Sequence, residues 1–476
     1  MQTYYLTSSL PYTNANPHIG FALEIVQADV IARWHRQKGE DVFFLTGTDE
    51  HGIKVARTAA EAGVPPQEFT DHISSRFREL MRALRISNDD FIRTTDQERH
   101  WPAVREVWKK LQENMDLEKK AYEGLYCSGC EAFITEKELV EGKCSIHKKE
   151  PEKIAEENWF FHLHKYTFPL KEKIEKGELQ IVPETKKKEV LQFIESEPIL
   201  ISVSRPKEKL QWGIPVPGDD TQVVYVWLEA LVNYISALGY PDGQKFKKYW
   251  PANIHIIGKD ILRFHAVIWP AILRALKIDL PKTIFVHGFI TVEGQKMSKS
   301  LGNVVDPFAL VEKYGTDAVR YYLLREIPPF EDGDFTEEKF KERYNSDLAN
   351  GLGNLVSRVL SLAQRNNSLK PPYSLKGADQ EFTKFFRERK NHFVEDYLDN
   401  FRFSEALEAI WYAISWCDKY IEYEKPWASP KPEVIGNLLF ALGEIANLLK
   451  PFLPETSEKI LKQLQEGKGE SLFPRK

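Results

Sequence analysis

The amino-acid sequence predicts an α/β protein in which a parallel-sheet domain is split by an insertion and followed by an all-helical bundle. Strand and helix patterns alternate over residues 1–117 and again over 219–330. Residues 118–218 interrupt the alternation with short strand-like pieces and a cysteine cluster. From 331 to 476 helical patterns recur between proline-containing turns. Alternating strands and helices are typical of a parallel sheet with crossover helices, whereas successive helices indicate a bundle.

The α/β domain begins with Thr3–Ser9, which is rich in β-favouring residues and predicts a strand. Ala22–Lys38 carries apolar residues at helical spacing, and the glycine at 39 marks a helix end. Val42–Leu45 predicts a short apolar strand, from which residues 47–52 lead into another helix. Ligands of parallel sheets gather beyond the carboxyl ends of the strands, so we expect a site in the segments that follow these strands.

The second half of the domain repeats this pattern. Val223–Trp227 and Asn253–Ile257 predict strands that each run into a helix, and Thr283–Val286 predicts a further strand. Beyond Phe330 we expect helices alone. The sheet is therefore expected to be assembled from two segments that are far apart in the sequence.

The composition is that of an ordinary soluble globular protein. The 476 residues are 42% hydrophobic and 28% charged, and 65 Lys+Arg against 70 Asp+Glu give a net charge of −5. This charge argues against broad binding to nucleic acids. The start resembles no signal peptide, and no apolar run approaches the roughly 20 residues that cross a bilayer. We therefore expect a cytoplasmic protein without a membrane partner.

The cysteines indicate a structural zinc site. Cys127 and Cys130 are followed by Cys144 and His147, so two ligand pairs with the same spacing flank a short loop. Three thiolates and one imidazole would close a tetrahedral Zn²⁺ site and stabilise an insertion with little apolar content. In the alternative interpretation only the three thiols cluster, and His147 is a surface residue. Cys417 lies on an apolar helical face and is expected to be a core thiol.

Two segments carry the residue types that phosphate chemistry needs. Lys296 and Lys299 stand in a polar loop that could close over a polyphosphate and neutralise a leaving pyrophosphate. Charge alone is more typical of a solvated basic loop. His18 stands at the start of the first long helix, where free N–H groups and the helix dipole favour phosphate and Gly20 would let a nucleotide approach. Taken alone, His18 is more often a capping surface histidine.

Together, Pro17–Phe21 and Lys296–Ser300 resemble the two signatures of class I aminoacyl-tRNA synthetases, and nearly the whole chain resembles the methionyl-tRNA synthetase family. One departure is Phe21, which stands where the family usually has a second histidine, and we assign it no catalytic role. The phosphate contacts would then fall on His18, the helix start and the lysines. Further matching segments are Leu10–Asn14, Gly47–Gly52, Ser204–Pro206, Trp212–Pro217, Tyr225–Leu228, Gly258–Asp260 and Phe289–Ser300.

The resemblance implies a Rossmann-like catalytic domain in two halves (1–117 and 219–330), a connective insertion with a zinc knuckle (118–218), and a connecting segment with an α-helical anticodon-binding domain (331–476). It implies that His18, Lys296 and Lys299 are catalytic, together with Mg²⁺ bound to ATP. The residues expected at ATP are His18, Gly20, Gly258, Asp260 and Lys299. By itself, Asp260 is also a plausible helix N-cap.

The resemblance also implies an aromatic pocket for the methionine side chain, which suits a polarizable thioether. Asp49 would receive the substrate ammonium, and Arg205 would balance carboxylate or phosphate charge. In the alternative interpretation, Trp227 and Trp269 are simply core aromatics. The residues expected at methionine are Tyr12, Asp49, Arg205, Trp227, Tyr234, His265 and Trp269.

In the helical region, the resemblance assigns Asn354, Arg358 and Trp427 to the anticodon, through hydrogen bonds to base edges and through stacking. The local pattern alone favours a solvated polar pair and a buried tryptophan. Nothing after the bundle resembles the oligonucleotide-binding (OB) domain of some relatives. Either the enzyme works as a monomer, or such an OB-fold is a separate chain.

The function implied is an ATP-dependent ligase that converts methionine to methionyl-adenylate and transfers it to the 3′-terminal adenosine of tRNA(Met), for initiation and elongation. Two alternatives are weighed against it. The first is a synthetase for another amino acid: one for isoleucine, valine or leucine would need a larger editing insertion, and one for cysteine would need thiol ligands at the amino-acid pocket. The second is a catalytically silent tRNA-binding paralogue, which is encouraged by Phe21 and discouraged by His18, Asp49, Asp260 and both lysines.

Overall fold

The computed structural model describes residues 1–127, 132–134, 139–144, 148–195, 200–297, 302–366, 370–371, 373, 379–429 and 431–476. The chain forms two compact units. The first comprises Met1–Asn16, Gly39–Glu79 and Asn88–His287, and the second comprises Pro17–Lys38, Leu80–Ser87 and Gly288–Lys476.

A six-stranded, all-parallel sheet forms the centre of the first unit, as the alternating pattern predicts. Its strands are β1 (Thr3–Ser8), β2 (Asp41–Thr48), β3 (Asp90–Arg93), β9 (Gln180–Val182), β14 (Ile254–Gly258) and β15 (Thr283–His287). The order is β3-β2-β1-β14-β15-β9. β14 is buried along its whole length and β2 at seven of its eight positions. Such apolar runs are typical of parallel strands covered on both faces.

The pairing of β1 joins the two halves of the domain. Leu6 of β1 is in register with Phe44 of β2 and with Ile254 of β14, so residues about 248 positions apart in the chain share one ladder. All three strands therefore end at one edge of the sheet. β9 lies within the predicted insertion, yet it pairs with β15 as the outer strand of this sheet.

Helices pack around this sheet, and the largest fully buried side chains of the unit include Trp108, Trp269, Tyr5, Tyr234 and Phe161. The helices of this part of the chain are α2 (Ile53–Glu61), α3 (Pro66–Ala83), α4 (Trp101–Glu113), α5 (His164–Glu175), α6 (Glu184–Glu195), α7 (Val226–Leu231), α8 (Asn233–Ser236), α9 (Gln244–Tyr249) and α10 (Trp269–Ala275). A 3-10 turn, η2 (Lys259–Ile261), and a π-helical segment, η3 (Phe264–Ile268), follow β14.

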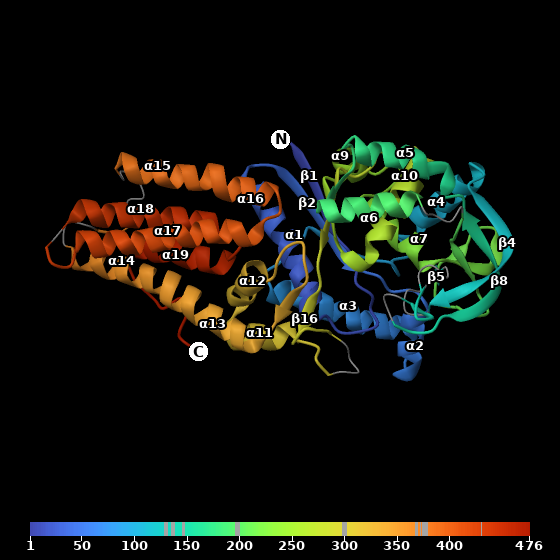
Figure 1. Cartoon of the computed structure of the whole chain (residues 1–476), viewed down its shortest axis with the longest axis horizontal. Coiled ribbons are helices and arrows are strands. Elements are labelled where there is room, and N and C mark those ends of the chain that lie inside the picture. The colour runs from blue at the N-terminus through green and yellow to red at the C-terminus, as the bar shows by residue number, and fades with distance from the viewer. Residues whose placement is uncertain are drawn as a thin grey trace. The chain divides into compact units, whose positions relative to one another are not determined.

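The insertion contains longer strands than the sequence pattern predicts. β4 (Leu117–Cys127) and β8 (Glu152–Phe161) have 11 and 10 residues, and they lie side by side as an antiparallel pair (Figure 1). Only six of their 21 residues are buried, so no continuous apolar run marks this length in the sequence, and antiparallel backbone pairing joins the two strands. The remaining strands of the first unit are β5 (Ala132–Ile134), β6 (Leu139–Val140), β7 (Lys143–Cys144), β10 (Ile201–Ser202), β11 (Ser204–Pro206), β12 (Pro215–Val216) and β13 (Asp219–Val224).

The second unit contains α1 (Ile19–Gln37), a small sheet and a helical bundle. The sheet is formed by β16 (Ile290–Val292), β17 (Gln295–Lys296) and β18 (Gly333–Phe335). The expectation of helices alone beyond Phe330 is therefore wrong at β18, a three-residue strand that pairs in parallel with β16. A strand this short is supported by its pairing partner and leaves little periodic signal of its own.

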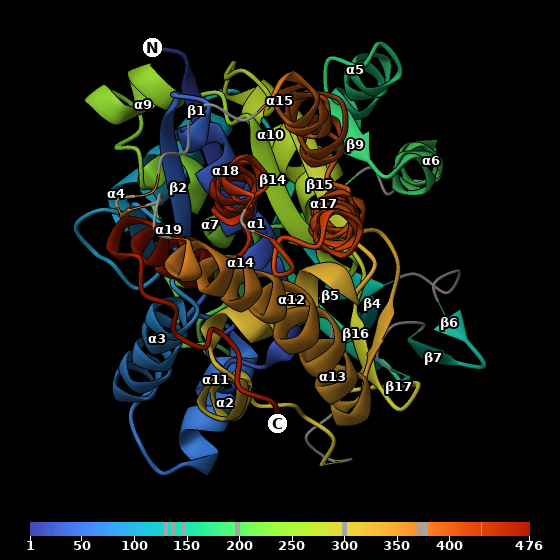
Figure 2. The ribbon, with the colours of Figure 1, turned by 90° about the vertical axis from the view of Figure 1, so that its left-hand side faces the viewer.

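The bundle helices α14 (Asn354–Arg365), α15 (Gln380–Glu388), α17 (Phe403–Glu424), α18 (Pro432–Leu449) and α19 (Pro454–Glu466) run alongside one another. Figure 2 shows α17 and α18 nearly end-on. Cys417 on α17 is 1% exposed, which confirms the predicted core thiol.

α18 is long and apolar enough to cross a membrane, with a mean hydropathy of 1.2, but 67% of it is buried, as in a core helix. The helices of this unit after β17 are α11 (Pro307–Tyr314), α12 (Thr316–Arg325), α13 (Glu337–Arg343), η5 (Tyr344–Gly353), α14 (Asn354–Arg365), α15 (Gln380–Glu388), η6 (Arg389–Val394), α16 (Glu395–Asp399), α17 (Phe403–Glu424), α18 (Pro432–Leu449) and α19 (Pro454–Glu466).

Candidate active site

Tyr12 and Asp49 meet just beyond the carboxyl ends of β1 and β2. They form an isolated parallel bridge, in which the Asp49 N–H donates to the Pro11 carbonyl at 2.9 Å and the Thr13 N–H donates to the Asp49 carbonyl at 3.0 Å. Asp49 is 3% exposed. A carboxylate fixed by its backbone at this edge is suited to accept charge-assisted hydrogen bonds from an ammonium group.

An aromatic wall adjoins this bridge. The strand predicted over Val223–Trp227 ends at Val224, and Trp227 lies in the first turn of α7. The Trp227 ring meets the Tyr12 ring edge-on at 5.9 Å between centroids and stacks on Phe264 at 3.5 Å. Phe264 was not among the predicted site residues, although it directly precedes His265. The three rings form a surface that an apolar, polarizable side chain could contact.

Tyr234 and His265 are joined by a hydrogen bond, and a second partner of His265 fixes which ring nitrogen carries the proton in the neutral imidazole. His265 Nδ1 lies 3.0 Å from the Ile261 carbonyl, which can only accept, so this nitrogen carries a proton. Nε2 then accepts from the Tyr234 hydroxyl at 2.7 Å in the neutral ring. Both side chains are buried, at 1% and 5% exposed. The structure therefore brings these two predicted residues together.

Trp269 lies behind this pair and is 0% exposed. Its ring is 6.0 Å from that of Tyr234, and its Nε1–H donates to His255 Nε2 at 3.3 Å. His255 also stacks on Tyr234 at 4.3 Å and shares a hydrogen bond with the Thr7 hydroxyl at 2.8 Å. Burial, and then the neighbouring His265, hold the pKa of His255 well below its ordinary value. His255 therefore supports the aromatic pocket as a neutral acceptor.

Arg205 lies in β11 and is 2% exposed. Its Nη1 donates to the Ser202 hydroxyl at 2.6 Å and to the Ser204 carbonyl at 2.8 Å. The guanidinium carbon stands 3.9 Å from the ring centroid of Tyr225, the N-cap residue of α7. The structure thus places Arg205 at the start of the helix that carries Trp227, and its contact with a ligand stays a prediction.

Gly258 ends β14, and the exposed Asp260 follows it inside η2. A β-carbon at position 258 would lie 2.9 Å from Asp260 Oδ1 and 3.7 Å from His287 Nε2. The glycine therefore gives the Asp260 carboxylate room to turn back over the strand end. Because Gly258 is the N-cap of η2, the alternative role of Asp260 as N-cap of that turn is wrong.

In the second unit, His18 is the N-cap of α1, and its Nδ1 accepts from the Gly20 N–H at 3.0 Å. The Ile19 N–H donates to the Val305 carbonyl at 3.1 Å. The expectation of free N–H groups at this helix start is therefore wrong for the first two donors. Burial lowers the pKa of His18, and a neutral ring with Nδ1 as acceptor presents Nε2–H as a donor.

The two signature segments come together within this unit. A β-carbon at position 20 would lie 2.9 Å from His18 Cε1 and 3.5 Å from Met297 Cε, so Gly20 makes room for the imidazole itself. Lys296 is exposed in β17, with its ammonium 4.9 Å from the Phe289 ring centroid. Lys299 lies outside the described residues. The exposed Lys296 and the donor of His18 suit contacts with anionic oxygens.

Two of the predicted zinc ligands lie in one apolar cluster. Cys127 ends β4 and Cys144 ends β7, and both are buried against Ile134 at 1% and 3% exposed. Cys130 and His147 lie outside the described residues. Within the described part, no group of three or more potential ligands comes together.

The predicted anticodon residues lie in the bundle. Asn354 is exposed on α14, while Leu355 and Val359 of the same helix are buried. Arg358 donates to Asp418 at 3.1 Å and to Glu422 at 2.6 Å, so α17 carboxylates hold its guanidinium. Trp427 follows the end of α17 and is 49% exposed, which overturns the buried alternative.

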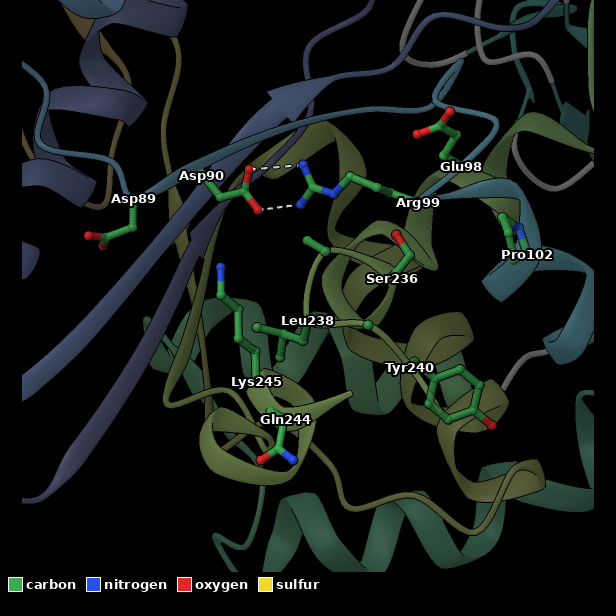
Figure 3. A pocket seen from close by; sticks show the side chains of 12 residues that line it. Asp89, Asp90, Glu98, Arg99, Pro102, Ser236, Leu238, Tyr240, Gln244 and Lys245 are labelled. Carbon is green, nitrogen blue, oxygen red and sulfur yellow. Dashed lines mark hydrogen bonds and ion pairs between the residues drawn. The ribbon is translucent and has the colours of Figure 1, made fainter. Parts of the chain in front are cut away.

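A cavity of about 630 Å³ lies elsewhere in the first unit, beside the start of β3 (Figure 3). Asp90 and Arg99 pair across it, and Lys245 extends into it from α9. Among its described lining residues, none belongs to the predicted site. Ser236 lines it and shares a hydrogen bond with the buried His100, the N-cap residue of α4, which in turn contacts Glu229 of α7.

Comparison with known proteins agrees with this geometry. Residues 4–145 and 134–360 match the family "tRNA synthetases class I (M)", and residues 387–475 match "Anticodon-binding domain of tRNA ligase". The chain is 43% identical to a methionine–tRNA ligase of Caldanaerobacter subterraneus subsp. tengcongensis, over 100% of this chain and 79% of the relative. It is also 43% identical to a methionine–tRNA ligase of Thermotoga maritima, over 97% of this chain and 75% of the relative.

The chain belongs to the methionine–tRNA ligase family. It is also similar to a solved Mycobacterium tuberculosis methionyl-tRNA synthetase in complex with methionyl-adenylate, with a TM-score of 0.90 and 38% identity over 100% of this chain and 98% of that one. As a member of the methionine–tRNA ligase family the chain is an aminoacyl-tRNA ligase, and the predicted fold class is confirmed. The silent-paralogue alternative is not favoured, and the exact domain boundaries stay predictions.

The pocket predicts a pH dependence of stability. The pKa of His255 is lowered in the folded chain, so the unfolded chain binds an additional proton once the pH falls below about 6.5. The contribution of His255 to the free energy of unfolding is therefore fully present above that pH. At lower pH it falls by up to about 1.4 kcal/mol per pH unit, until the pH reaches the lowered pKa of His255 in the folded chain. Calorimetry between about pH 5 and pH 8 should show this loss of thermal stability.

His255→Gln removes the titrating ring, and we expect a shallower dependence of the melting temperature on pH in this variant. The control is His72→Gln, because His72 is exposed on α3. It should keep the slope of the unaltered chain. Identical slopes in all three proteins would contradict the assignment to His255.

Proposed function

We propose that this chain activates methionine with ATP, forming methionyl-adenylate and pyrophosphate, and transfers methionine to the 3′-terminal adenosine of tRNA(Met). The observation that carries the proposal is the bridge between Tyr12 and Asp49, which sets a buried carboxylate beside a wall of aromatic rings. A ligand with an ammonium group and a flexible apolar side chain fits this pair of features. The similarity to an enzyme solved with methionyl-adenylate supports the same ligand.

The binding roles follow from the chemistry of the groups. Asp49 would hold the ammonium, and the rings of Tyr12, Trp227 and Phe264 would contact the thioether. Tyr234 and His265 form a polar contact of fixed geometry, and Arg205 would balance the substrate carboxylate. A side chain of the wrong shape or polarity would lose these contacts.

The activation step needs positioning and charge stabilisation, not a side-chain nucleophile. The methionine carboxylate attacks the α-phosphorus of ATP, and pyrophosphate leaves. His18 would donate from Nε2 to a phosphate oxygen, and Lys296 and Lys299 would neutralise the leaving group. Gly258 and Asp260 would contact the adenosine, with the carboxylate accepting from ribose hydroxyls. Mg²⁺ bound to the ATP phosphates supplies further positive charge.

The first test is methionine-dependent exchange of pyrophosphate into ATP. We expect exchange with methionine and none with leucine. Asp49→Asn should lower kcat/KM for methionine by about tenfold to a hundredfold, since a hydrogen bond to a charged group contributes about 1.5–3 kcal/mol. Absence of methionine-dependent exchange in the unaltered, zinc-replete protein would refute the proposed function.

We also propose one structural Zn²⁺ held by Cys127, Cys130, Cys144 and His147. The burial of Cys127 and Cys144 in one small apolar cluster supports this, because that cluster has little apolar surface to stabilise the insertion. A closed set of three thiolates and one imidazole would leave no open position for catalysis.

Metal analysis tests the zinc site. We expect about one zinc per chain, lost in Cys127→Ser and Cys144→Ser because each removes a soft ligand. Both variants should also become sensitive to proteolysis within the insertion. The matched control is Cys417→Ser, another buried thiol, which should retain zinc. Full zinc content in both ligand variants would exclude these residues as ligands.

We further propose that Asn354, Arg358 and Trp427 contact the anticodon. The exposed Trp427 ring supports stacking on a base, and Arg358 would exchange its carboxylate partners for base edges. We also place the enzyme in the cytoplasm. A separate OB-fold chain as partner stays a prediction from the sequence.

Trp427→Ala should lower kcat/KM for tRNA in aminoacylation by about fivefold to a hundredfold, because stacking on a base contributes about 1–3 kcal/mol. Exchange of pyrophosphate should be unaffected. Phe168→Ala, which removes an aromatic ring that is 69% exposed on α5, serves as control and should charge tRNA normally. Equal charging by both variants would remove Trp427 from the anticodon site.

A further inference from the structure

A buried carboxylate lies between two imidazoles close to the proposed methionine site. Glu229 Oε1 is 2.9 Å from His51 Nδ1, and Glu229 Oε2 is 3.1 Å from His100 Nε2. The side chains are 0% exposed for Glu229, 2% for His51 and 0% for His100. None of the roles assigned above uses these groups, although burying a charge is costly unless it is paired.

The hydrogen-bonding state of the cluster follows from its geometry. A carboxylate can only accept, so His51 donates from Nδ1 and His100 donates from Nε2. His100 Nδ1 is in turn 2.9 Å from the hydroxyl of Ser236, which lines the cavity of Figure 3. Burial opposes ionisation of Glu229, but the two imidazoles outweigh it and lower its pKa. Each oxygen of Glu229 thus has one histidine donor.

The cluster connects two segments that carry ligand-contacting residues. Glu229 lies two positions after Trp227 on α7, and His51 lies two positions after Asp49. Two residues correspond to about 200° around a helix, so Trp227 and Glu229 face opposite sides of α7. The helix has six residues, too few to be stable by itself, so contacts on its two sides must set its orientation.

One side of α7 is set by the stack of Trp227 on Phe264, and the other by Glu229 and its two histidines. We propose that Glu229 is a positioning residue of the methionine site, which holds the Trp227 ring in a fixed place relative to Asp49 through hydrogen bonds from His51 and His100. The inference rests on the proposed function, because it assumes that Trp227 and Asp49 contact the same substrate. If this buried cluster served stability alone, changing it would not selectively alter the affinity for methionine.

The two histidines use different ring nitrogens, which allows a crossed test. The amide nitrogen of Asn can replace Nδ1 of a histidine, and that of Gln can replace Nε2. His51→Asn and His100→Gln therefore keep the donor, whereas His51→Gln and His100→Asn misplace it. We expect the first pair to have a KM for methionine within about threefold of the unaltered enzyme, and the second pair to raise it about tenfold, as loss of a hydrogen bond to a charged group predicts. The KM for ATP and kcat of exchange should change less than about twofold in all four.

The matched control is Asp116→Asn. Asp116 is 1% exposed and accepts from Lys165 Nζ at 3.0 Å and from the Tyr166 hydroxyl at 2.8 Å, so this variant perturbs another buried carboxylate that has two donors. It should lower the melting temperature and leave the KM for methionine unchanged. Melting curves with and without methionine, recorded for every variant, provide a second readout, in which the misplaced pair should lose ligand stabilisation.

Equal effects of Asn and Gln at both positions would overturn the proposal, as would a parallel rise in the KM for ATP. Variants of the misplaced pair that melt early yet keep the full stabilisation by methionine would assign the cluster to stability alone. Pyrophosphate exchange by the unaltered enzyme distinguishes failure of the proposed function from failure of the positioning role of Glu229. If that enzyme shows no methionine-dependent exchange, the proposed function fails; if it does and the crossed pattern is missing, this positioning role fails.

Discussion

The parallel pairing of β1 with β2 on one side and β14 on the other is the constraint on which the site depends. It joins segments about 248 residues apart and brings the carboxyl ends of three strands to one edge. Tyr12, Asp49 and Gly258 occupy that edge because they follow or end those strands. A slip of one position in any of these strands would turn its side chains to the other face and disrupt the buried sheet. The same register that buries the core therefore fixes the site.

At this edge of the sheet, uncharged polar groups and charged groups occupy different places. The aromatic pocket contains His255, a neutral ring whose Nε2 accepts from Trp269, and His265, whose Nδ1 donates to the Ile261 carbonyl. Asp49, assigned to the methionine ammonium, and Asp260, assigned to the ribose of ATP, stand where strands end. A protonated imidazole inside the pocket would lose an acceptor and be poorly solvated. This arrangement suits a substrate that is apolar at one end and charged at the other.

The sequence predicted the fold class correctly, because the fold class depends on local patterns. The site residues were predicted from signature segments, and their contacts with ligands stay predictions. The sequence missed what depends on contacts between distant residues. The long strands β4 and β8 stabilise each other through backbone pairing, and Trp227 belongs to a helix because β13 ends at Val224. Gly20 is required by the ring of His18, two residues away, which only the folded geometry reveals. Glu229 appears on an apolar stretch as an anomaly, and its partner His51 is 178 positions away.

A buried carboxylate orients a functional helix in each unit. In the second unit, Asp29 of α1 is 0% exposed and pairs with Arg33 and with Arg320 of α12, both at 2.7 Å. Burial opposes its ionisation, but the two guanidinium groups outweigh this and lower its pKa. Arg320 also donates to the carbonyls of Leu84, Pro451 and Phe452, so α1, which begins at His18, is anchored by directional contacts at its middle. Apolar packing tolerates small rotations of a helix, whereas a desolvated charge loses several kcal/mol when a partner moves away. Buried ionic contacts can therefore fix the rotation of α1 and α7, and with it the direction of the side chains that each helix presents.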